Sequence, residues 1–129
     1  MSFEGKILIV DDEAHVRKFL TLTVRQLGAP TILEATNGVE AVDIYKAESP
    51  ELVLLDVNMP VQDGLETLKK IVQHDPNAVV VMLTSLANRQ TVQEAVQNGA
   101  VNYLRKDTPK DEILNSLKRT IADCFPSNT

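Results

Sequence analysis

The stretch Lys6-Ile7-Leu8-Ile9-Val10 near the start of the chain runs directly into three acidic residues, Asp11-Asp12-Glu13. Its apolar residues are continuous rather than alternating, which indicates a strand buried on both faces, as in a parallel sheet covered by helices. Four further runs have this character, at residues 31–35, 52–55, 78–83 and, more weakly, 101–104. The sequence therefore predicts five parallel strands.

Between these runs the apolar residues follow a helical period. The longest stripe ends at Gly28 and consists of Val16, Phe19, Leu20, Thr23, Val24 and Leu27. The shorter stripes are Ala41, Val42 and Tyr45; Leu65, Leu68 and Val72; Val92, Ala95 and Val96; and Ile113, Leu117 and Ile121. Five helices thus alternate with five strands, and right-handed crossovers then give an α/β fold with a doubly wound parallel sheet and helices on both faces.

The composition bounds the size and the class of the protein. A chain of 129 residues accommodates one domain, which we expect to fill residues 1–125 and to leave a tail at residues 126–129. Hydrophobic residues make up 43% of the chain but aromatic residues only 4%, which excludes a disordered chain and predicts an aliphatic core. The net charge of −5 argues against direct binding of nucleic acid, because phosphate contacts need a basic surface.

Cysteine content and hydropathy indicate the compartment. Cys124 is the only cysteine, which excludes a disulfide framework and suits a reducing compartment. No stretch approaches the roughly 18 consecutive apolar residues of a membrane span, and the first residues lack the basic start of a signal peptide. We therefore expect a cytoplasmic protein that does not associate with membranes.

Polar residues follow four of the five predicted strands. Asp11 and Asp12 follow the first strand, Asp56 the third, Thr84 the fourth and Lys106 the fifth. In an open parallel sheet, ligands bind beyond the carboxyl ends of the strands, so these side chains could converge on one site. The glycine-rich phosphate-binding motifs of dinucleotide-binding and P-loop proteins are absent from the sequence, so a nucleotide is not the expected ligand.

Each of these residues also has an ordinary structural interpretation. Asp11, Asp12 and Thr84 could cap the helices that follow them, Asp56 could be a turn residue, and Lys106 could be solvated. These interpretations do not account for the charge. If the first and third strands are neighbours, three carboxylates meet there and raise one another's pKa unless a cation intervenes.

Mg²⁺ is the cation that fits such a set of oxygen ligands. Together with the ammonium of Lys106, it would balance the three carboxylates. A site of this kind can accept a phosphoryl group, because the cations neutralise the equatorial oxygens while one carboxylate attacks phosphorus in line. Thr84 would donate its hydroxyl to the phosphoryl oxygens.

Four segments carry a resemblance to a known family. They are Ile-Leu-Ile-Val-Asp-Asp-Glu at residues 7–13, Leu-Leu-Asp-Val-Asn-Met-Pro-Val-Gln-Asp-Gly at 54–64, Met-Leu-Thr-Ser at 82–85 and Gly-Ala-Val-Asn-Tyr-Leu-Arg-Lys at 99–106. The chain resembles, roughly from Lys6 to Cys124, the receiver domain of the two-component response regulators, the superfamily that includes the chemotaxis regulators. The resemblance implies a flavodoxin-like sheet with the strand order 2-1-3-4-5.

The resemblance also implies the function. Asp56 would accept a phosphoryl group from a phosphohistidine on a histidine kinase or phosphotransfer protein, while Lys106 and Thr84 bind that group. The hydroxyl of Thr84 would couple to Tyr103, which turns inward and changes a surface that binds a partner. The protein would be no conventional enzyme, since it would catalyse only its own phosphorylation and dephosphorylation. Its output would pass through an unknown protein or through an output domain missing from this chain.

The same resemblance implies the ligands of the metal ion. Asp12 would bind Mg²⁺ directly, Asp11 through a water molecule and Asn58 through its backbone carbonyl, next to the carboxylate of Asp56. We expect His15 to be an ordinary surface residue, so that the phosphoryl-donating histidine comes from a partner. His74 and Cys124 are likewise expected to have no chemical role.

Two residues depart from the pattern of the family. Asp107 replaces the proline that usually follows the lysine through a cis peptide bond, so the loop is either trans and differently placed or contains a strained bond. Ser85 replaces the alanine or glycine that usually follows the threonine. Both changes leave Asp56 intact and bear on the lifetime of the phosphoryl group and on the geometry of switching.

Two alternatives to a self-contained phosphoacceptor remain open. Phosphatases with an aspartate nucleophile also place this residue after a strand, but they need a second carboxylic acid two residues later, where this chain has Asn58. The other alternative is a receiver fragment of a longer regulator.

Overall fold

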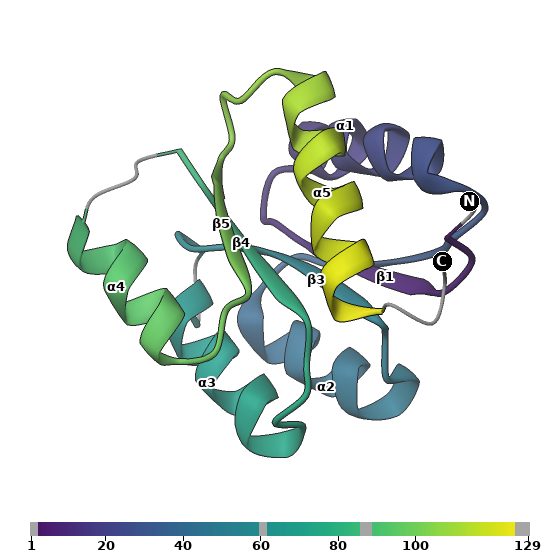
Figure 1. Cartoon of the computed structure of the whole chain (residues 1–129). Helices are drawn as coiled ribbons and strands as arrows, with labels where there is room; N and C mark the ends of the chain where they lie inside the picture. The colour runs from purple at the N-terminus through teal and green to yellow at the C-terminus, as the bar shows by residue number, and fades with distance from the viewer. Residues whose placement is uncertain (1–2, 60–61, 86–88, 126–129) are drawn as a thin grey trace.

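The computed structural model describes residues 3–59, 62–85 and 89–125. Its strands are β1 (Lys6–Val10), β2 (Thr31–Ala35), β3 (Leu52–Asp56), β4 (Val80–Thr84) and β5 (Asn102–Arg105). Its helices are α1 (Ala14–Val24), the 3₁₀ helix η1 (Arg25–Leu27), α2 (Gly38–Glu48), α3 (Gly64–His74), α4 (Arg89–Gln97) and α5 (Lys110–Cys124). Strands and α-helices alternate along the chain, as Figure 1 shows.

The five strands form one parallel sheet in the order β2-β1-β3-β4-β5, which confirms the expected order. In this order β1 lies between β2 and β3, so that Val10 pairs with both Ala35 and Leu55. The chain leaves β1 in one direction along the sheet and returns past it to β3. The carboxyl ends of β1 and β3 therefore lie side by side at the point where the strand order reverses, the usual ligand site of such a sheet.

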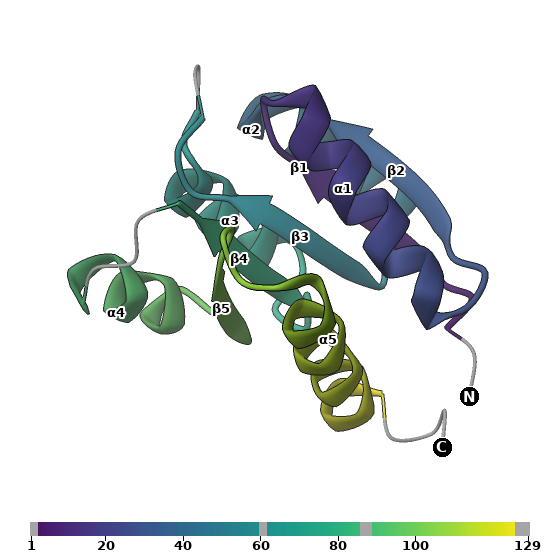
Figure 2. The same cartoon turned by 90° about the horizontal axis from the view of Figure 1, so that it is seen from above.

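Each face of the sheet carries its own aliphatic core. Leu8 and Val10 point to the face covered by α2, α3 and α4, whereas Ile7 and Ile9 point to the face covered by α1 and α5. Figure 2, a view from above, shows this division of the helices between the two faces. All four side chains are at most 1% exposed. The continuous apolar run of β1 thus arises because both of its faces are covered.

The start of α3 lies directly against the end of β3. Asp63 caps the helix, since its Oδ1 accepts a hydrogen bond of 2.9 Å from the backbone N–H of Glu66. A Cβ atom on Gly64 would overlap with the carbonyl oxygen of Asp56. Glycine at this position therefore allows the helix to approach the strand that carries Asp56.

The structure differs from the sequence prediction in some boundaries and in two side chains. The strands predicted at 78–83 and 101–104 are observed at Val80–Thr84 and Asn102–Arg105, and the first helix continues beyond Val24 as a 3₁₀ turn. The expectation that Phe19 and Val96 are buried is wrong, because these side chains are 38% and 60% exposed. The predicted tail at residues 126–129 lies outside the described residues. Within the described part of the chain, none of the helices has the length and apolarity needed to cross a bilayer.

Candidate functional site

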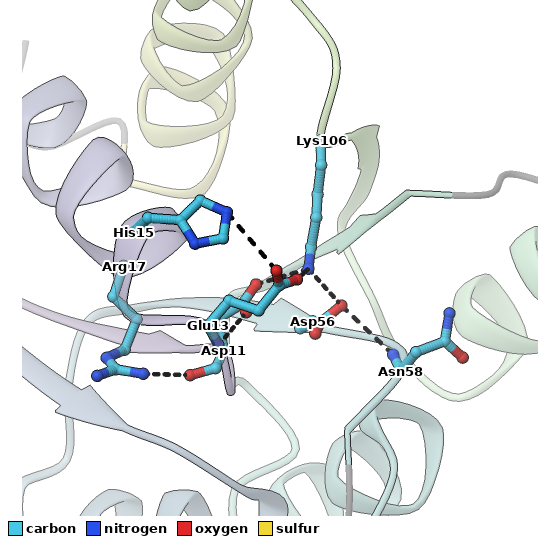
Figure 3. A network of polar contacts seen from close by, with 7 residues as sticks. All are labelled: Asp11, Glu13, His15, Arg17, Asp56, Asn58 and Lys106. Atoms are coloured by element: carbon cyan, nitrogen blue, oxygen red, sulfur yellow. Dashed lines mark hydrogen bonds and ion pairs between the residues drawn. The ribbon is translucent and has the colours of Figure 1, made fainter.

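The carboxyl ends of β1, β3 and β5 contribute the charged groups of the site. Lys106, which follows β5, places its Nζ 2.7 Å from Oδ2 of Asp11 and 3.1 Å from Oδ1 of Asp56. Both carboxylates are almost fully buried, with exposures of 1% and 2%. Figure 3 shows the lysine pointing down between the two acidic side chains. One half-buried ammonium therefore faces two buried carboxylates.

The electrostatics of the site reflect this imbalance. Burial raises the pKa of Asp56, the neighbouring charge of Asp11 raises it further, and the contacts with Lys106 and the backbone of Asn58 only partly offset these effects, which leaves a pKa of about 6. Burial lowers the pKa of Lys106, but the hydrogen bonds and charges of Asp11 and Asp56 outweigh it and raise that pKa overall. The expected rise in pKa is thus found at Asp56, where burial contributes more than the neighbouring carboxylate.

The donor atoms of this site fit a divalent cation. Carboxylate oxygens of Asp11, Asp12 and Asp56 lie within 4.8 Å of one another. Oδ2 of Asp56 is buried and has no hydrogen-bond partner within the described part of the chain, while Asp12 is exposed to solvent. Three neighbouring carboxylates that one lysine balances only in part repel one another, and a bound cation relieves this repulsion. Hard oxygen donors and an open side toward water suit Mg²⁺.

The remaining predicted site residues lie around this cluster. The backbone N–H of Asn58 donates to Oδ1 of Asp56 at 3.3 Å, and the side chain of Asn58 is exposed. Thr84 is fully buried at the end of β4, and its carbonyl accepts from the N–H of Lys106 at 2.7 Å. Ser85 is exposed next to it. Thr84 therefore lies at the same edge of the sheet as the cluster, where the parallel strands end.

Tyr103 lies within β5, on the side of the sheet away from α5. Its ring is partly buried against the core formed under α2, α3 and α4, and its hydroxyl is buried without a hydrogen-bond partner within residues 3–59, 62–85 and 89–125. Its hydroxyl therefore makes no hydrogen bond to Asp56 or Lys106. Tyr103 is connected to the cluster through β5, which ends at Arg105, next to Lys106.

The loop after Lys106 adopts the first of the two expected conformations, because the Lys106–Asp107 peptide bond is trans. Asp107 pairs with Arg105 through two contacts, from Nε at 3.0 Å and from Nη2 at 2.8 Å. Both side chains of this pair are exposed, whereas Asp11 and Asp56 hold the lysine between them. The replacement of proline by Asp107 leaves the lysine within reach of both carboxylates.

Two neighbours of the cluster carry charge close to it. A carboxylate oxygen of Glu13 lies 3.9 Å from Nζ of Lys106, and its other oxygen lies 3.6 Å from Nε2 of the exposed His15. Arg17 donates from Nη1 to the backbone carbonyl of Asp11 at 2.8 Å. Sequence reasoning missed Arg17. The available signal was a cation near the amino end of a helix without acidic residues in its first turn, where the helix dipole disfavours positive charge.

The other expectations concern residues away from the cluster. The His74 ring packs edge-on against Tyr45 at a centroid distance of 6.2 Å, so it takes part in helix packing. Burial, and then the charge of Asp123, raise the pKa of the Cys124 thiol, which makes it a poor nucleophile.

Comparison with known proteins places these features in a family. A family model described as the response regulator receiver domain matches residues 7–118. The chain is 36% identical over 116 residues to the chemotaxis protein CheY of Bacillus subtilis, covering 90% of this chain and 97% of that protein. It is 38% identical over 114 residues to sporulation initiation phosphotransferase F of the same species, covering 88% of this chain and 91% of that protein.

Solved structures show the same architecture. Chemotaxis protein CheY4 of Vibrio cholerae superimposes with a TM-score of 0.84 at 28% identity, covering 92% of this chain and 99% of that one. A CheX–CheY–BeF₃–Mg²⁺ complex from Borrelia burgdorferi contains a chain with a TM-score of 0.84 and 32% identity, covering 93% of this chain and 88% of that one. These values show that the five-stranded fold is shared over nearly the whole chain.

Proposed function

Because the chain belongs to the family of response regulator receiver domains, the signalling domains of two-component systems, we propose that Asp56 is its phosphoacceptor. The observation that carries this proposal is the environment of the Asp56 carboxylate. Oδ1 is held by Nζ of Lys106 at 3.1 Å and by the N–H of Asn58 at 3.3 Å, while Oδ2 is without a hydrogen-bond partner within the described part of the chain. The oriented carboxylate thus has one oxygen available for attack.

The chemistry follows from this orientation. Oδ2 attacks phosphorus, the bond between phosphorus and the imidazole nitrogen of a donor phosphohistidine breaks, and its electron pair goes to that nitrogen. Nζ of Lys106 neutralises the negative charge of the transferred group. In the separate dephosphorylation step, water attacks phosphorus, the bond between phosphorus and Oδ2 breaks and its electron pair restores the carboxylate, while inorganic phosphate leaves and the proton of the water passes to solvent. The protein thereby catalyses its own phosphorylation and dephosphorylation, and it is not a conventional enzyme.

Asp11, Asp12, Asp56 and the backbone carbonyl of Asn58 would hold Mg²⁺. When bound, the cation supplies charge neutralisation for the carboxylates and for the incoming phosphoryl oxygens. The clustering of the three carboxylates within 4.8 Å supports this assignment. The similar Borrelia burgdorferi structure, which contains Mg²⁺ and BeF₃, supports the same cation for this chain.

Thr84 and Tyr103 would transmit the event. Thr84 is buried at the strand end beside the cluster, so a phosphoryl group on Asp56 would draw its hydroxyl toward the new oxygens. Tyr103 lies on the neighbouring strand, with its β5 backbone paired to β4. A shift of Thr84 would change the packing of the Tyr103 ring and hence the surface around β5.

The partners follow from the same proposal. The phosphoryl donor would be a histidine kinase or a phosphotransfer protein, and the output would be a protein that recognises the altered surface or a domain beyond this chain. The acidic net charge of −5 supports a protein partner rather than nucleic acid. A cytoplasmic location and a domain that spans residues 1–125 belong to this proposal as well.

The test is incorporation of a phosphoryl group from a small phosphodonor with Mg²⁺, measured by intact mass. The parent chain should gain one phosphoryl group, and Asp56→Asn should gain none. The matched control is Asp63→Asn, which changes a carboxylate at the start of α3 and keeps an oxygen that can cap the helix. Full labelling of Asp56→Asn would refute the assignment, and rapid turnover of external phosphate esters would favour the phosphatase alternative instead.

A further inference from the structure

Arg17 joins the end of β1 to the edge strand of the sheet. From its place in α1, its Nη1 donates to the carbonyl oxygen of Asp11 at 2.8 Å and its Nε donates to Oε1 of Glu34, in β2, at 3.0 Å. The Arg17 side chain is 17% exposed, whereas that of Glu34 is 51% exposed. Figure 3 shows the guanidinium below the cluster, on the side away from Lys106. Arg17 therefore contacts the backbone of the site rather than its carboxylates.

This contact completes the fixation of the Asp11 backbone. The N–H of Asp11 donates to the carbonyl of Ala35 at 3.1 Å, and Oδ1 of Asp11 accepts from the N–H of Glu13 at 2.9 Å. The carbonyl of Asp11 shares one rigid peptide plane with the N–H of Asp12. The hydrogen bond from Arg17 thus orients the peptide that joins the two acidic residues, and with it the directions in which their side chains leave the backbone.

We propose that Arg17 is a positioning residue for the divalent cation. By holding the Asp11–Asp12 peptide, it keeps the two carboxylates turned toward Asp56. The inference rests on the proposed function, because it concerns the cation that would bind between these three residues. Residues that orient metal ligands typically change metal affinity by about 10- to 100-fold when they are removed.

The charge of Arg17 predicts the opposite result. A guanidinium close to a cation site repels the bound cation, so an arginine that acted only as a charge would weaken Mg²⁺ binding, and its removal would tighten it. An arginine that acts through the Asp11 carbonyl strengthens binding, and its removal weakens it. The direction of the change in affinity therefore separates the two effects.

The experiment is a titration of the full chain with Mg²⁺ alone, followed through the amide resonances of residues 56–58, with thermal melting recorded for each variant. Arg17→Gln should raise the Kd for Mg²⁺ by about tenfold. Lys18→Gln, which removes an exposed charge one residue away, should keep the Kd within roughly twofold of the parent value. A reduced stability alone leaves the Kd unchanged as long as the titration is done well below the melting temperature.

Arg17→Lys serves as the second variant, including the case that Arg17→Gln does not fold. Lysine keeps the charge, but it lacks the planar guanidinium that reaches both the Asp11 carbonyl and Glu34. The Kd of the Arg17→Lys variant for Mg²⁺ should therefore also rise. An unchanged or lower Kd for Mg²⁺ in a folded Arg17 variant would overturn the inference. The proposed function would stand in that case, provided that the parent chain binds Mg²⁺ and accepts a phosphoryl group. A parent chain that binds no Mg²⁺ would overturn the metal part of the proposed function and this inference with it.

Discussion

Nζ of Lys106 lies 3.1 Å from Oδ1 of Asp56, an ion pair that joins the loop after β5 to the last residue of β3. Since β4 lies between these two strands in the sheet, the lysine side chain reaches across the carboxyl end of β4. The Asp56 carboxylate is buried and the lysine side chain is only 15% exposed, and the same Nζ lies 2.7 Å from Oδ2 of Asp11. The order of the strands thus places the ammonium of Lys106 between Asp11 and Asp56, and this single positive charge balances only one of the two carboxylates.

The first prediction concerns this unbalanced charge. Asp56→Asn should raise the free energy of unfolding of the metal-free protein at neutral pH by about 1 to 3 kcal/mol, because it removes a buried carboxylate that repels Asp11. Chemical denaturation in the presence of a chelator measures the change. Asp43→Asn, at an exposed position of α2, is the matched control and should change stability by less than about 0.5 kcal/mol.

The same variant should alter the pH dependence of stability. The pKa of Asp56 is about 6 in the folded protein and 3.8 as its ordinary value, so the folded state binds more protons than the unfolded state between these pH values. Ionisation of Asp56 therefore lowers the stability of the parent as pH rises from about 4 to 6. In Asp56→Asn, this decrease in stability between about pH 4 and 6 should be absent. An identical pH profile in both proteins would contradict the raised pKa.

The second prediction removes the cation instead. Lys106→Met leaves Asp11 and Asp56 facing each other without a buried counter-charge, so it should lower the free energy of unfolding at neutral pH without Mg²⁺ by about 2 to 4 kcal/mol. Added Mg²⁺ should recover part of the loss. Lys110→Met, at the exposed first position of α5, should have little effect in either condition. Equal stability of the two variants in chelator would contradict the proposed charge balance.

Much of the fold was predictable because the pattern of burial is local. Ile7, Leu8, Ile9 and Val10 are covered on both faces, and a continuous apolar run is the direct result. The exposure of Phe19 was not predictable in this way. Its helical spacing places it beside Leu20 and Thr23, but the width of the contact between α1 and the sheet is set by tertiary packing, which leaves Phe19 exposed.

The site likewise has features that the sequence predicted and features that only the structure revealed. The polar residue after each strand was visible in the sequence, and the sheet order then brought Asp11, Asp56 and Lys106 together. The strand order itself came from the family resemblance, since no local pattern decides which strands are neighbours. The contact from Arg17 to Glu34 joins a helix to an edge strand and depends on that order, so only the structure revealed it.

The third prediction is that metal removal leaves the domain folded. The two cores are built from aliphatic side chains on each face of the sheet, and none of the proposed ligands belongs to either core. In chelator the protein should melt in one cooperative transition, at a lower temperature than with Mg²⁺. Phosphorylation from a small phosphodonor should stop. Loss of the cooperative transition in chelator would point to a structural metal instead.

The fourth prediction compares two buried tyrosine hydroxyls. The hydroxyl of Tyr45 donates to Oδ2 of Asp75 at 2.8 Å, whereas that of Tyr103 is buried without a partner within the described part of the chain. Removing a satisfied buried hydroxyl loses a hydrogen bond, while removing an unsatisfied one relieves a desolvation cost. Tyr45→Phe should therefore lower the free energy of unfolding by about 1 kcal/mol, and Tyr103→Phe should raise it by a similar amount.

Denaturant titrations of both variants in the unphosphorylated state give the comparison. The two substitutions remove the same atom, so their opposite signs cannot arise from the change in hydrophobicity. A stabilised Tyr103→Phe would mean that the unphosphorylated domain holds the Tyr103 hydroxyl at a cost, which favours any rearrangement of β5 that gives it a partner or returns it to water. A Tyr103→Phe variant that is destabilised as much as Tyr45→Phe would contradict this, because its hydroxyl would then have a partner in solution.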